Sequence, residues 1–598
     1  MNDIENTKIM ADRIRGLHRE RAQLLALPPE KALDRILEAP HPAALVHSLP
    51  EEDFYFLVHD IGPEDALPLL TLASDSQLEY ILDLEGWQQD RIQMPALTKW
   101  LELMMRAQPQ RLVTWLVEEK TEFAEFFLHK NVQLLIREHD EDPSDFGDDF
   151  FTFDDVYYAR LFRDPLPIKG DAADGDPPIE ESEERRLTFL RTLLNRIADN
   201  DHVWYQQLMM NASGVLPAEA EEELYRLRNV RLAEKGFLPF DEAIGVYQPL
   251  AAEDLLRQSA KVFSRSGEEL ASLPVPHYPV GMLGEKTPFS DALRLVDSDV
   301  QLEQLQLEFA LLCNQIIAAD QRLIRDKTLL REMVRKACGY LSLGLEALVA
   351  SGSSKDTGGS MASRWAACVT RFPLSQIFRV GYGRVLHSKW QVQGWQKKAW
   401  FMANNLPLSF WGERWMGLLG GLLIKKPRFF DNYQSGRLYR EFESLADIDA
   451  TEKAVDQIMA MDELLSRMKV PCRINAKSLL TYKSLLLTLW ARHYLTLPAA
   501  TDAKRRLVPL KKDEFVRFFT DLFGVKSEAS PKAPRKTMKT MKVSFLNWLS
   551  ECSGDSASHL TGRLGPTLEA LFEELDAELG GVGIRDLDSR FINLFHIK

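Results

Sequence analysis

The stretch that decides the fold runs from residue 41 to residue 92 and reads HPAALVHSLPEEDFYFLVHDIGPEDALPLLTLASDSQLEYILDLEGWQQDRI. It repeats one kind of helix start, a proline followed by acidic residues, at Pro50 and Pro63, and the same signal occurs earlier at Pro29. Proline costs nothing in the first helical turn, where its missing N–H would have no partner, and the acidic residues face the positive end of the helix dipole. The pattern predicts short helices in close succession.

A capping box gives a fourth helix start at Ser74. Ser74 and Gln77 precede LEYILDL, and in this motif each side chain accepts a hydrogen bond from the other residue's backbone N–H. The intervals between the proline starts are uneven, so the helices do not follow a strict repeat. We expect residues 24–136 to fold as at least five short antiparallel helices stacked into a superhelix, with no strand.

Length and composition bound the class of protein. A chain of 598 residues is too long for one hydrophobic core, while 45% hydrophobic and 27% charged residues are typical of a globular protein. The net charge of −15 disfavours nonspecific binding of the whole molecule to nucleic acid. Five scattered cysteines without a CxxC pair favour reduced thiols over a disulfide framework or a zinc knuckle.

No membrane or export signal is expected. The first residues lack the apolar core of a signal peptide, and the most apolar run, at residues 415–424, is half of what a bilayer crossing needs. The sequence therefore predicts a cytoplasmic protein without a transmembrane segment.

Two resemblances concern the N-terminal helices. The run at residues 41–92 resembles the cytoplasmic N-terminal superhelical domain of MgtE-type magnesium transporters. Together with LLALPPEKALDRIL at residues 24–37 and FLPFDEAIGVYQPL at residues 237–250, it resembles an uncharacterised family of large soluble bacterial proteins. That family implies an all-helical fold and supplies no activity. The MgtE similarity covers only part of the chain, without the transporters' CBS modules or membrane domain, so it does not imply transport.

An acidic insert occupies residues 137–185, and between Glu138 and Glu184 seventeen acidic residues face three basic ones. Its aromatic stretch FFTFDDVYYARLF predicts a small β-hairpin near residues 150–162. Clustered carboxylates suit Mg²⁺ or Ca²⁺, and the candidate ligands are Asp140, Asp142, Asp148 and Asp149. EF-hand registers started at Asp140 and Asp142 both place phenylalanine where the bidentate glutamate belongs, so we favour a solvated acidic loop.

An apolar stripe predicts a long core helix further on. Leu305, Phe309, Leu312 and Ile316 follow at alternating intervals of four and three residues, as one helix face requires. The stripe breaks at Asp326 and resumes at residue 330. We expect these side chains to be buried against neighbouring helices.

The charge inverts between residues 361 and 430, with eleven basic residues, one acidic residue and six tryptophans. Basic and aromatic side chains together suit phosphate contacts and base stacking. The anion-binding candidates are Arg384, Lys389, Lys397, Lys398, Lys425, Lys426 and Arg428. The tryptophan spacing does not fit one helix face, so some rings must be core. We favour a packed domain with a basic rim over an anionic-partner site, and both over a dock for the acidic insert.

These features divide the chain into a short-helix domain (1–136), the acidic insert (137–185), a helical domain (186–350), a Gly/Ser loop with the basic tryptophan-rich segment (351–440) and a C-terminal helical region with a loop near 526–538 (441–598). The expected fold is mainly α, a multidomain helical superhelix with a small β-hairpin insertion.

No motif names a reaction. The chain lacks a Walker A sequence, GxSxG and HExxH, and His41, His47 and His59 have no metal-ligand spacing, so we expect surface or capping roles for them. No catalytic residue and no cofactor is predicted. We expect a non-catalytic helical scaffold that binds other proteins. The alternatives are nucleic-acid or anionic-lipid binding through residues 361–430, and divalent-cation sensing, with Mg²⁺ or Ca²⁺, through the acidic insert.

Overall fold

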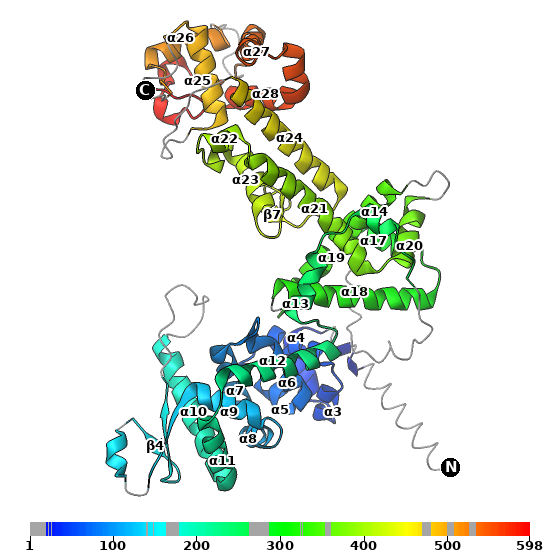
Figure 1. Cartoon of the computed structure of the whole chain (residues 1–598), viewed down its shortest axis with the longest axis vertical. Helices are drawn as coiled ribbons and strands as arrows, with labels where there is room; N and C mark the ends of the chain where they lie inside the picture. The colour runs from blue at the N-terminus through cyan, green and yellow to red at the C-terminus, as the bar shows by residue number, and fades with distance from the viewer. Residues whose placement is uncertain are drawn as a thin grey trace. The chain divides into compact units, whose positions relative to one another are not determined.

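The fold is described from a computed structural model of the chain (Figure 1). The residues described are 20–21, 23–24, 27–138, 141–147, 149–162, 179–261, 286–322, 324–325, 327–352, 360–468, 480–498, 507–524 and 534–598. Two compact units share the chain. The N-terminal unit comprises Met1–Val246, Lys261–Lys286 and Val296–Ala337, and the C-terminal unit comprises Tyr247–Ala260, Thr287–Leu295 and Cys338–Lys598.

The N-terminal unit is built from short helices that pack on near neighbours in sequence, such as α4 on α6, α5 on α7 and α8 on α9. Its helices are α2 (Pro29–Leu37), α3 (Pro42–His47), α4 (Glu51–Ile61), α5 (Leu67–Leu72), α6 (Asp75–Glu85), α7 (Met94–Ala107), α8 (Pro109–Glu118), α9 (Thr121–Asn131), α10 (Ile179–Asn200), α11 (His202–Ser213), α12 (Pro217–Glu234), α13 (Phe240–Ala243), α18 (Asp299–Asp320) and the start of α19 (Lys327–Ser351). Short 3-10 turns occur at Pro143–Phe146 and Ile244–Tyr247.

The predicted helix starts lie at or next to helix boundaries. Pro29 is the first residue of α2, Pro50 is the N-cap of α4, and Pro63 lies in the turn before α5. The capping box forms as expected, and Gln77 also donates from Nε2 to the carbonyls of Val46 and Leu49, both at 2.9 Å. The cap of α6 therefore also holds the end of α3.

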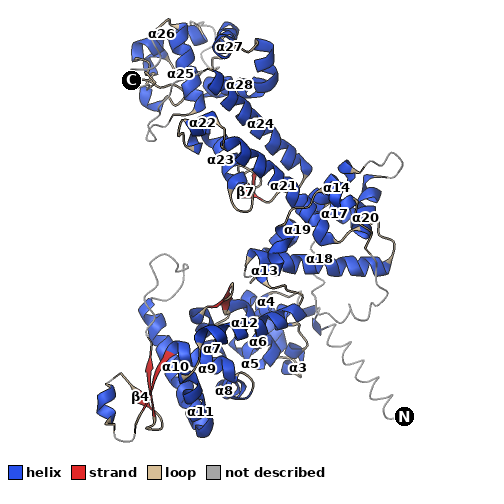
Figure 2. Cartoon of the chain, viewed as in Figure 1, coloured by secondary structure: helices blue, strands red, loops and turns tan. Residues whose placement is uncertain are grey.

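Strands are few (Figure 2), but two sets interrupt residues 24–136, so the expectation of no strand there is wrong. The strands β1 (Trp87–Gln88) and β2 (Arg91–Ile92) form a tight hairpin, because Gln89 adopts a left-handed backbone conformation with φ of 60°. The strand β3 (Val132–Ile136) continues directly from α9. It pairs with the hairpin that the sequence predicts, β4 (Phe151–Thr152) and β5 (Tyr157–Leu161), in the antiparallel order β3-β5-β4.

The apolar stripe is buried as expected. Leu305, Phe309 and Ile316 are fully buried in α18, and Leu312 is 2% exposed. The helix ends at Asp320, before the expected break at Asp326, and its C-cap Gln321 has a φ of 52°, in the left-handed region. The next helix, α19, begins at Lys327.

The C-terminal unit is also helical, and glycines let its helices approach closely. A Cβ at Gly344 in α19 would collide with the backbone of Ile377, and one at Gly381 would collide with the backbone of Tyr340. The elements are α14 (Ala252–Leu256), α17 (Pro288–Leu293), the rest of α19, α20 (Met361–Arg371), α21 (Leu374–Gln396), α22 (Trp400–Ala403), α23 (Gly412–Leu423), β6 (Phe429–Phe430), β7 (Tyr439–Arg440), α24 (Leu445–Arg467), α25 (Tyr482–Tyr494), α26 (Lys512–Phe523), α27 (Lys539–Ser553), α28 (Ala557–Leu579) and 3-10 turns at Leu408–Trp411, Ile584–Asp586 and Ser589–Phe591.

The expected fold class, a mainly α multi-helix protein with a small β-hairpin, is confirmed. Most of the expected loops at 351–360 and 526–538 lies outside the described residues. In the part of the chain that the structure describes, no helix is both long enough and apolar enough to span a bilayer.

Truncation of the stripe should destabilise the N-terminal unit. Leu312→Ala removes buried methyl groups and leaves a cavity, so we expect a loss of about 2–5 kcal/mol in the free energy of unfolding, measured by urea denaturation. Val300→Ala is the matched control, because Val300 lies in the same helix and is 54% exposed. An unchanged denaturation midpoint for Leu312→Ala would contradict the packing.

A buried glutamate in α4 gives a second prediction. Glu52 is 5% exposed, and burial raises the pKa of its carboxyl from 4.5 to about 7, although Lys235 opposes the shift. The folded state therefore favours the protonated carboxyl of Glu52. Its contribution to the free energy of unfolding is fully present below about pH 4.5 and is lost as the pH rises through about 7.

Glu52→Gln should remove this dependence. The shift corresponds to about 3 kcal/mol, so the variant should gain stability relative to the wild type as the pH rises from 5 to 8. The measurement is the urea midpoint of both proteins across that range, where the other titrating groups cancel in the difference. Parallel curves for the two proteins would contradict the shift.

Candidate functional site

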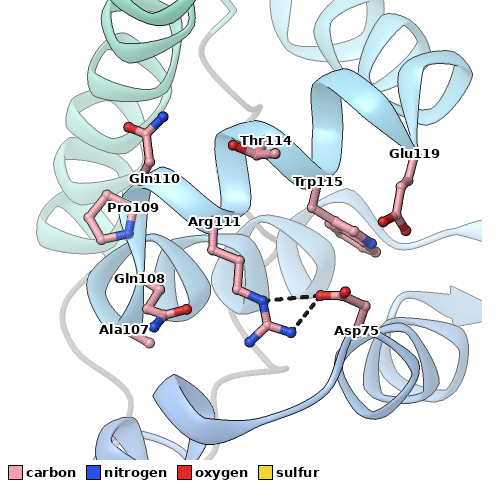
Figure 3. Close-up of a pocket in the computed structure, with 9 residues that line it drawn as sticks. All are labelled: Asp75, Ala107, Gln108, Pro109, Gln110, Arg111, Thr114, Trp115 and Glu119. Carbon is pink, nitrogen blue, oxygen red and sulfur yellow. Dashed lines mark hydrogen bonds and ion pairs between the residues drawn. The ribbon is translucent and has the colours of Figure 1, made fainter.

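A groove follows α8 in the N-terminal unit and begins with the pocket drawn in Figure 3. This pocket has a volume of about 520 Å³ and lies where α7 meets α8 and faces the start of α6. Its lining residues are Asp75, Ala107, Gln108, Pro109, Gln110, Arg111, Thr114, Trp115 and Glu119. Gln108 is both the C-cap of α7 and the N-cap of α8, and Pro109 is the first residue of α8. Proline has no backbone N–H, and an N–H in the first turn of a helix would have no partner within the helix, so no hydrogen bond is lost here.

An arginine fixes one wall of this pocket. Arg111 projects from α8 and donates from Nε and Nη2 to Asp75 Oδ1, at 3.1 Å and 2.5 Å (Figure 3). It also donates to the carbonyl of Ala73 at 2.5 Å. These bonds hold α8 against the N-terminus of α6.

A second pocket continues the groove past Trp115. Its volume is about 390 Å³, and it shares Trp115 and Glu119 with the first pocket. The residues that line it come from α6, the β1–β2 hairpin, α7, α8, α9 and α12: Glu79, Leu82, Asp83, Trp87, Ile92, Leu97, Trp115, Glu119, Lys120, Thr121, Glu122, Phe123, Leu224, Leu227 and Arg231. We call the two pockets together the α8 groove.

Charged residues order the far end of the α8 groove. Arg231 forms a bidentate pair with the buried carboxylate of Asp83, at 2.8 Å and 2.7 Å, and lies 3.1 Å from Glu79. Lys120 donates to Glu79 as well. This network joins α12 to α6 and to the start of α9.

Trp115 separates the two pockets and carries an unused donor. The side chain is 6% exposed, and in the described part of the chain its Nε1–H has no hydrogen-bond acceptor. A buried N–H without an acceptor costs about 1–3 kcal/mol. The nitrogen is buried, so a carbonyl bound in the groove accepts this hydrogen bond only when the indole ring turns toward the groove.

A third pocket, of about 500 Å³, lies on the other side of Trp87, and we call it the Trp87 pocket. The end of α6, the β1–β2 hairpin, α7, α12, the segment around α13 and the end of α18 supply its walls. They contribute Leu84, Glu85, Trp87, Gln88, Gln89, Gln93, Pro95, Ala96, Tyr225, Arg228, Asn229, Leu232, Phe237, Leu238, Phe240, Ile317, Ala318, Gln321, Arg322 and Arg325.

The carboxylate of Glu85, at the edge of the Trp87 pocket, is the centre of a buried network. It accepts from Tyr55 Oη at 2.7 Å and from Arg325 at 3.0 Å and 2.7 Å, and His59 Nε2 lies 3.2 Å away. Burial alone would raise the pKa of Glu85, but hydrogen bonds from these three partners hold it at about 2. Burial and the Glu85 carboxylate in turn raise the pKa of Tyr55.

This network favours a structural role over acid–base catalysis. A carboxyl with a pKa of about 2 stays ionised at neutral pH and cannot serve as a proton donor. His59, expected at the surface or in a cap, is instead mostly buried beside Glu85. Sequence reasoning missed Glu85, although it follows Leu78 and Ile81 at helical spacing, which places an acidic residue on the buried face of α6.

The metal candidates of the acidic insert are not brought together by the described residues. Asp142 and Asp149 are exposed, while Asp140 and Asp148 lie outside the described residues. Among the residues that the structure describes, no three His, Cys, Asp or Glu side chains are grouped as metal ligands would be. Asp154 instead orders the hairpin turn by accepting from the N–H groups of Val156 and Tyr157.

Three of the anion-binding candidates make contacts within the C-terminal unit. Lys389 donates to the carbonyls of residues 424 and 425, Lys426 lies 4.3 Å from the ring centre of Tyr247, and Arg428 lies 3.7 Å from Glu441. The other four candidates are exposed: Arg384, Lys397, Lys398 and Lys425.

Two of the six tryptophans of the basic segment are buried in the core. Trp411 and Trp415 are 1% and 7% exposed, and their ring centres lie 5.9 Å apart. Trp395 packs on Trp411 at 6.0 Å, whereas Trp390 is half exposed. Trp395, Trp411 and Trp415 therefore form a packed aromatic cluster and not a stacking platform.

Comparison with known proteins gives one assignment. A search of the curated proteins finds no match, and a search of the solved structures finds none either. These comparisons do not confirm the resemblance to MgtE-type transporters. One family model matches residues 12–598, almost the whole chain, and its description is a family of unknown function. The chain therefore belongs to the DUF6178 family.

Proposed function

We propose that this protein is a non-catalytic helical scaffold that binds an extended segment of another protein in the α8 groove. The observation that carries the proposal is the unsatisfied Nε1–H of Trp115 at the junction of two adjoining pockets. When the indole ring of Trp115 turns toward the groove, a backbone carbonyl of the bound segment accepts this bond. Tryptophan is also among the residues that dominate binding energy at protein interfaces.

The lining of the α8 groove suits a peptide better than a small reactive substrate. Apolar side chains such as Leu97, Leu224 and Phe123 alternate with ion pairs that are already complete within the chain. The groove thus offers apolar contact and a few polar anchors, the composition of many protein interfaces. Arg111 and Asp75 offer polar contacts at the opposite end.

The proposal also covers the cellular location of the protein and its resemblance to MgtE-type transporters. We place the protein in the cytoplasm, and we take from the MgtE resemblance only the stacking of short helices. Divalent-cation sensing by the acidic insert, and nucleic-acid or anionic-lipid binding by the basic segment, stay predictions. No specific contact of the described residues favours either one over the α8 groove.

The test uses a photoreactive amino acid at position 114, in the groove, and a control at position 192, an exposed threonine of α10 outside it. We expect adducts with a discrete protein in the native host only from position 114. The cross-linked segment, made as a synthetic peptide, should bind the full-length protein.

Two arginine substitutions then locate the binding site. Thr114→Arg should weaken peptide binding at least about tenfold by filling the groove, and Thr192→Arg should leave it unchanged. Titration by fluorescence anisotropy measures both. Equal adducts from the two positions, or equal affinity of the two variants, would refute the proposal.

A further inference from the structure

Arginines outnumber acidic residues among the side chains that line the Trp87 pocket. Three arginines line it, Arg228, Arg322 and Arg325, whereas Glu85 is the one acidic residue among its lining residues. Glu85 is already committed to the bidentate bond with Arg325. Among the described residues, Arg322 pairs with one carboxylate, that of Glu332, at 3.7 Å. The pocket therefore attracts an anion.

Arg228 is the group best placed to hold that anion. Its Nε donates to the backbone carbonyl of Asp83 at 2.7 Å, and its guanidinium lies 5.5 Å from the ring centre of Trp87. Within the described part of the chain, the two terminal nitrogens have no hydrogen-bond acceptor and no carboxylate at ion-pair distance. Burial lowers the pKa of Arg228, although the nearby carboxylate of Asp83 opposes the shift. An arginine fixed at Nε presents its outer N–H groups in the geometry that phosphate oxygens prefer.

The remaining walls suit a planar ring. Trp87 and Tyr225 lie with their ring centres 5.7 Å apart at an angle of 46°, both partly exposed. Side-chain amides surround them, and Gln89 donates to Gln321 at 3.1 Å. Aromatic side chains stack on nucleobases, and amides can pair with the polar edges of the bases. The volume of about 500 Å³ lies within the range of small-molecule sites.

We propose that the Trp87 pocket binds a nucleoside monophosphate, with the phosphate on Arg228 and Arg322 and the base against Trp87 and Tyr225. This site is distinct from the α8 groove in its chemistry, although Trp87 lines both. It needs no peptide to be bound, so the two proposals fail or hold independently.

The test is isothermal titration of the full-length protein with AMP, GMP, CMP and UMP. At least one should bind with a dissociation constant below about 1 mM, and the matching nucleoside and inorganic phosphate alone should each bind at least about tenfold more weakly. Absence of binding by all four nucleotides would overturn the proposal. Equally tight binding of phosphate alone would overturn the base contact.

Matched variants locate the site. Arg228→Gln should weaken nucleotide binding at least about tenfold, whereas Arg226→Gln should leave it unchanged, because Arg226 is an exposed residue of the same helix that pairs with Glu223 and does not line the pocket. Arg322→Gln, at an exposed position, gives a second variant if Arg228→Gln fails to fold, and should weaken binding about fivefold. Binding that is equal in all three variants and the wild type would contradict the assignment.

Discussion

The carboxylate of Glu85 is the interaction on which the N-terminal unit depends. It joins α6, where it lies, to Tyr55 and His59 of α4 and to Arg325, which follows α18 and is 240 residues away in sequence. A buried carboxylate is tolerated only when donors surround it, and breaking one buried partner leaves an uncompensated charge. The network therefore fixes where α6 ends and where the chain after α18 returns to it.

The path of the chain immediately after Glu85 depends on where the Glu85 network fixes the end of α6. A Cβ at position 86 would collide with the carbonyl oxygen of Leu82, so only glycine lets the backbone pass this close to the last turn of α6. The next residue is Trp87, which lines both the α8 groove and the Trp87 pocket. The two proposed binding sites thus share a wall whose place is set by the Glu85 network.

Local signals made much of the fold predictable from the sequence. The capping box of Ser74 and Gln77 and the stripe from Leu305 to Ile316 depend on residues within one helix, so spacing alone reveals them. The hairpin at β4 and β5 was predictable for the same reason. Its third strand, β3, was not, because pairing with β5 joins residues about 20 to 30 positions apart and VQLLI is equally typical of the end of a helix.

The candidate sites were far less predictable. Arg228 on Trp87, Arg231 on Asp83 and Arg325 on Glu85 all join residues that are more than 100 positions apart, and no spacing rule connects them. Composition pointed instead to the acidic insert and the basic segment. There Trp411 and Trp415 prove to be buried, and Lys389, Lys426 and Arg428 contact their own unit. The charges in a sequence indicate which segments attract oppositely charged groups, but they do not show which side chains come into contact.

The central claim is that the Glu85 carboxylate organises the N-terminal unit, and hydrogen–deuterium exchange of Glu85→Gln tests it most directly. The amide loses the negative charge that Tyr55, His59 and Arg325 surround. We predict that exchange in α4 and α6 rises at least about tenfold, with no change in α24, and that Glu118→Gln, at an exposed position of α8, changes neither. Exchange in α4 and α6 at the wild-type rate in Glu85→Gln would contradict the account.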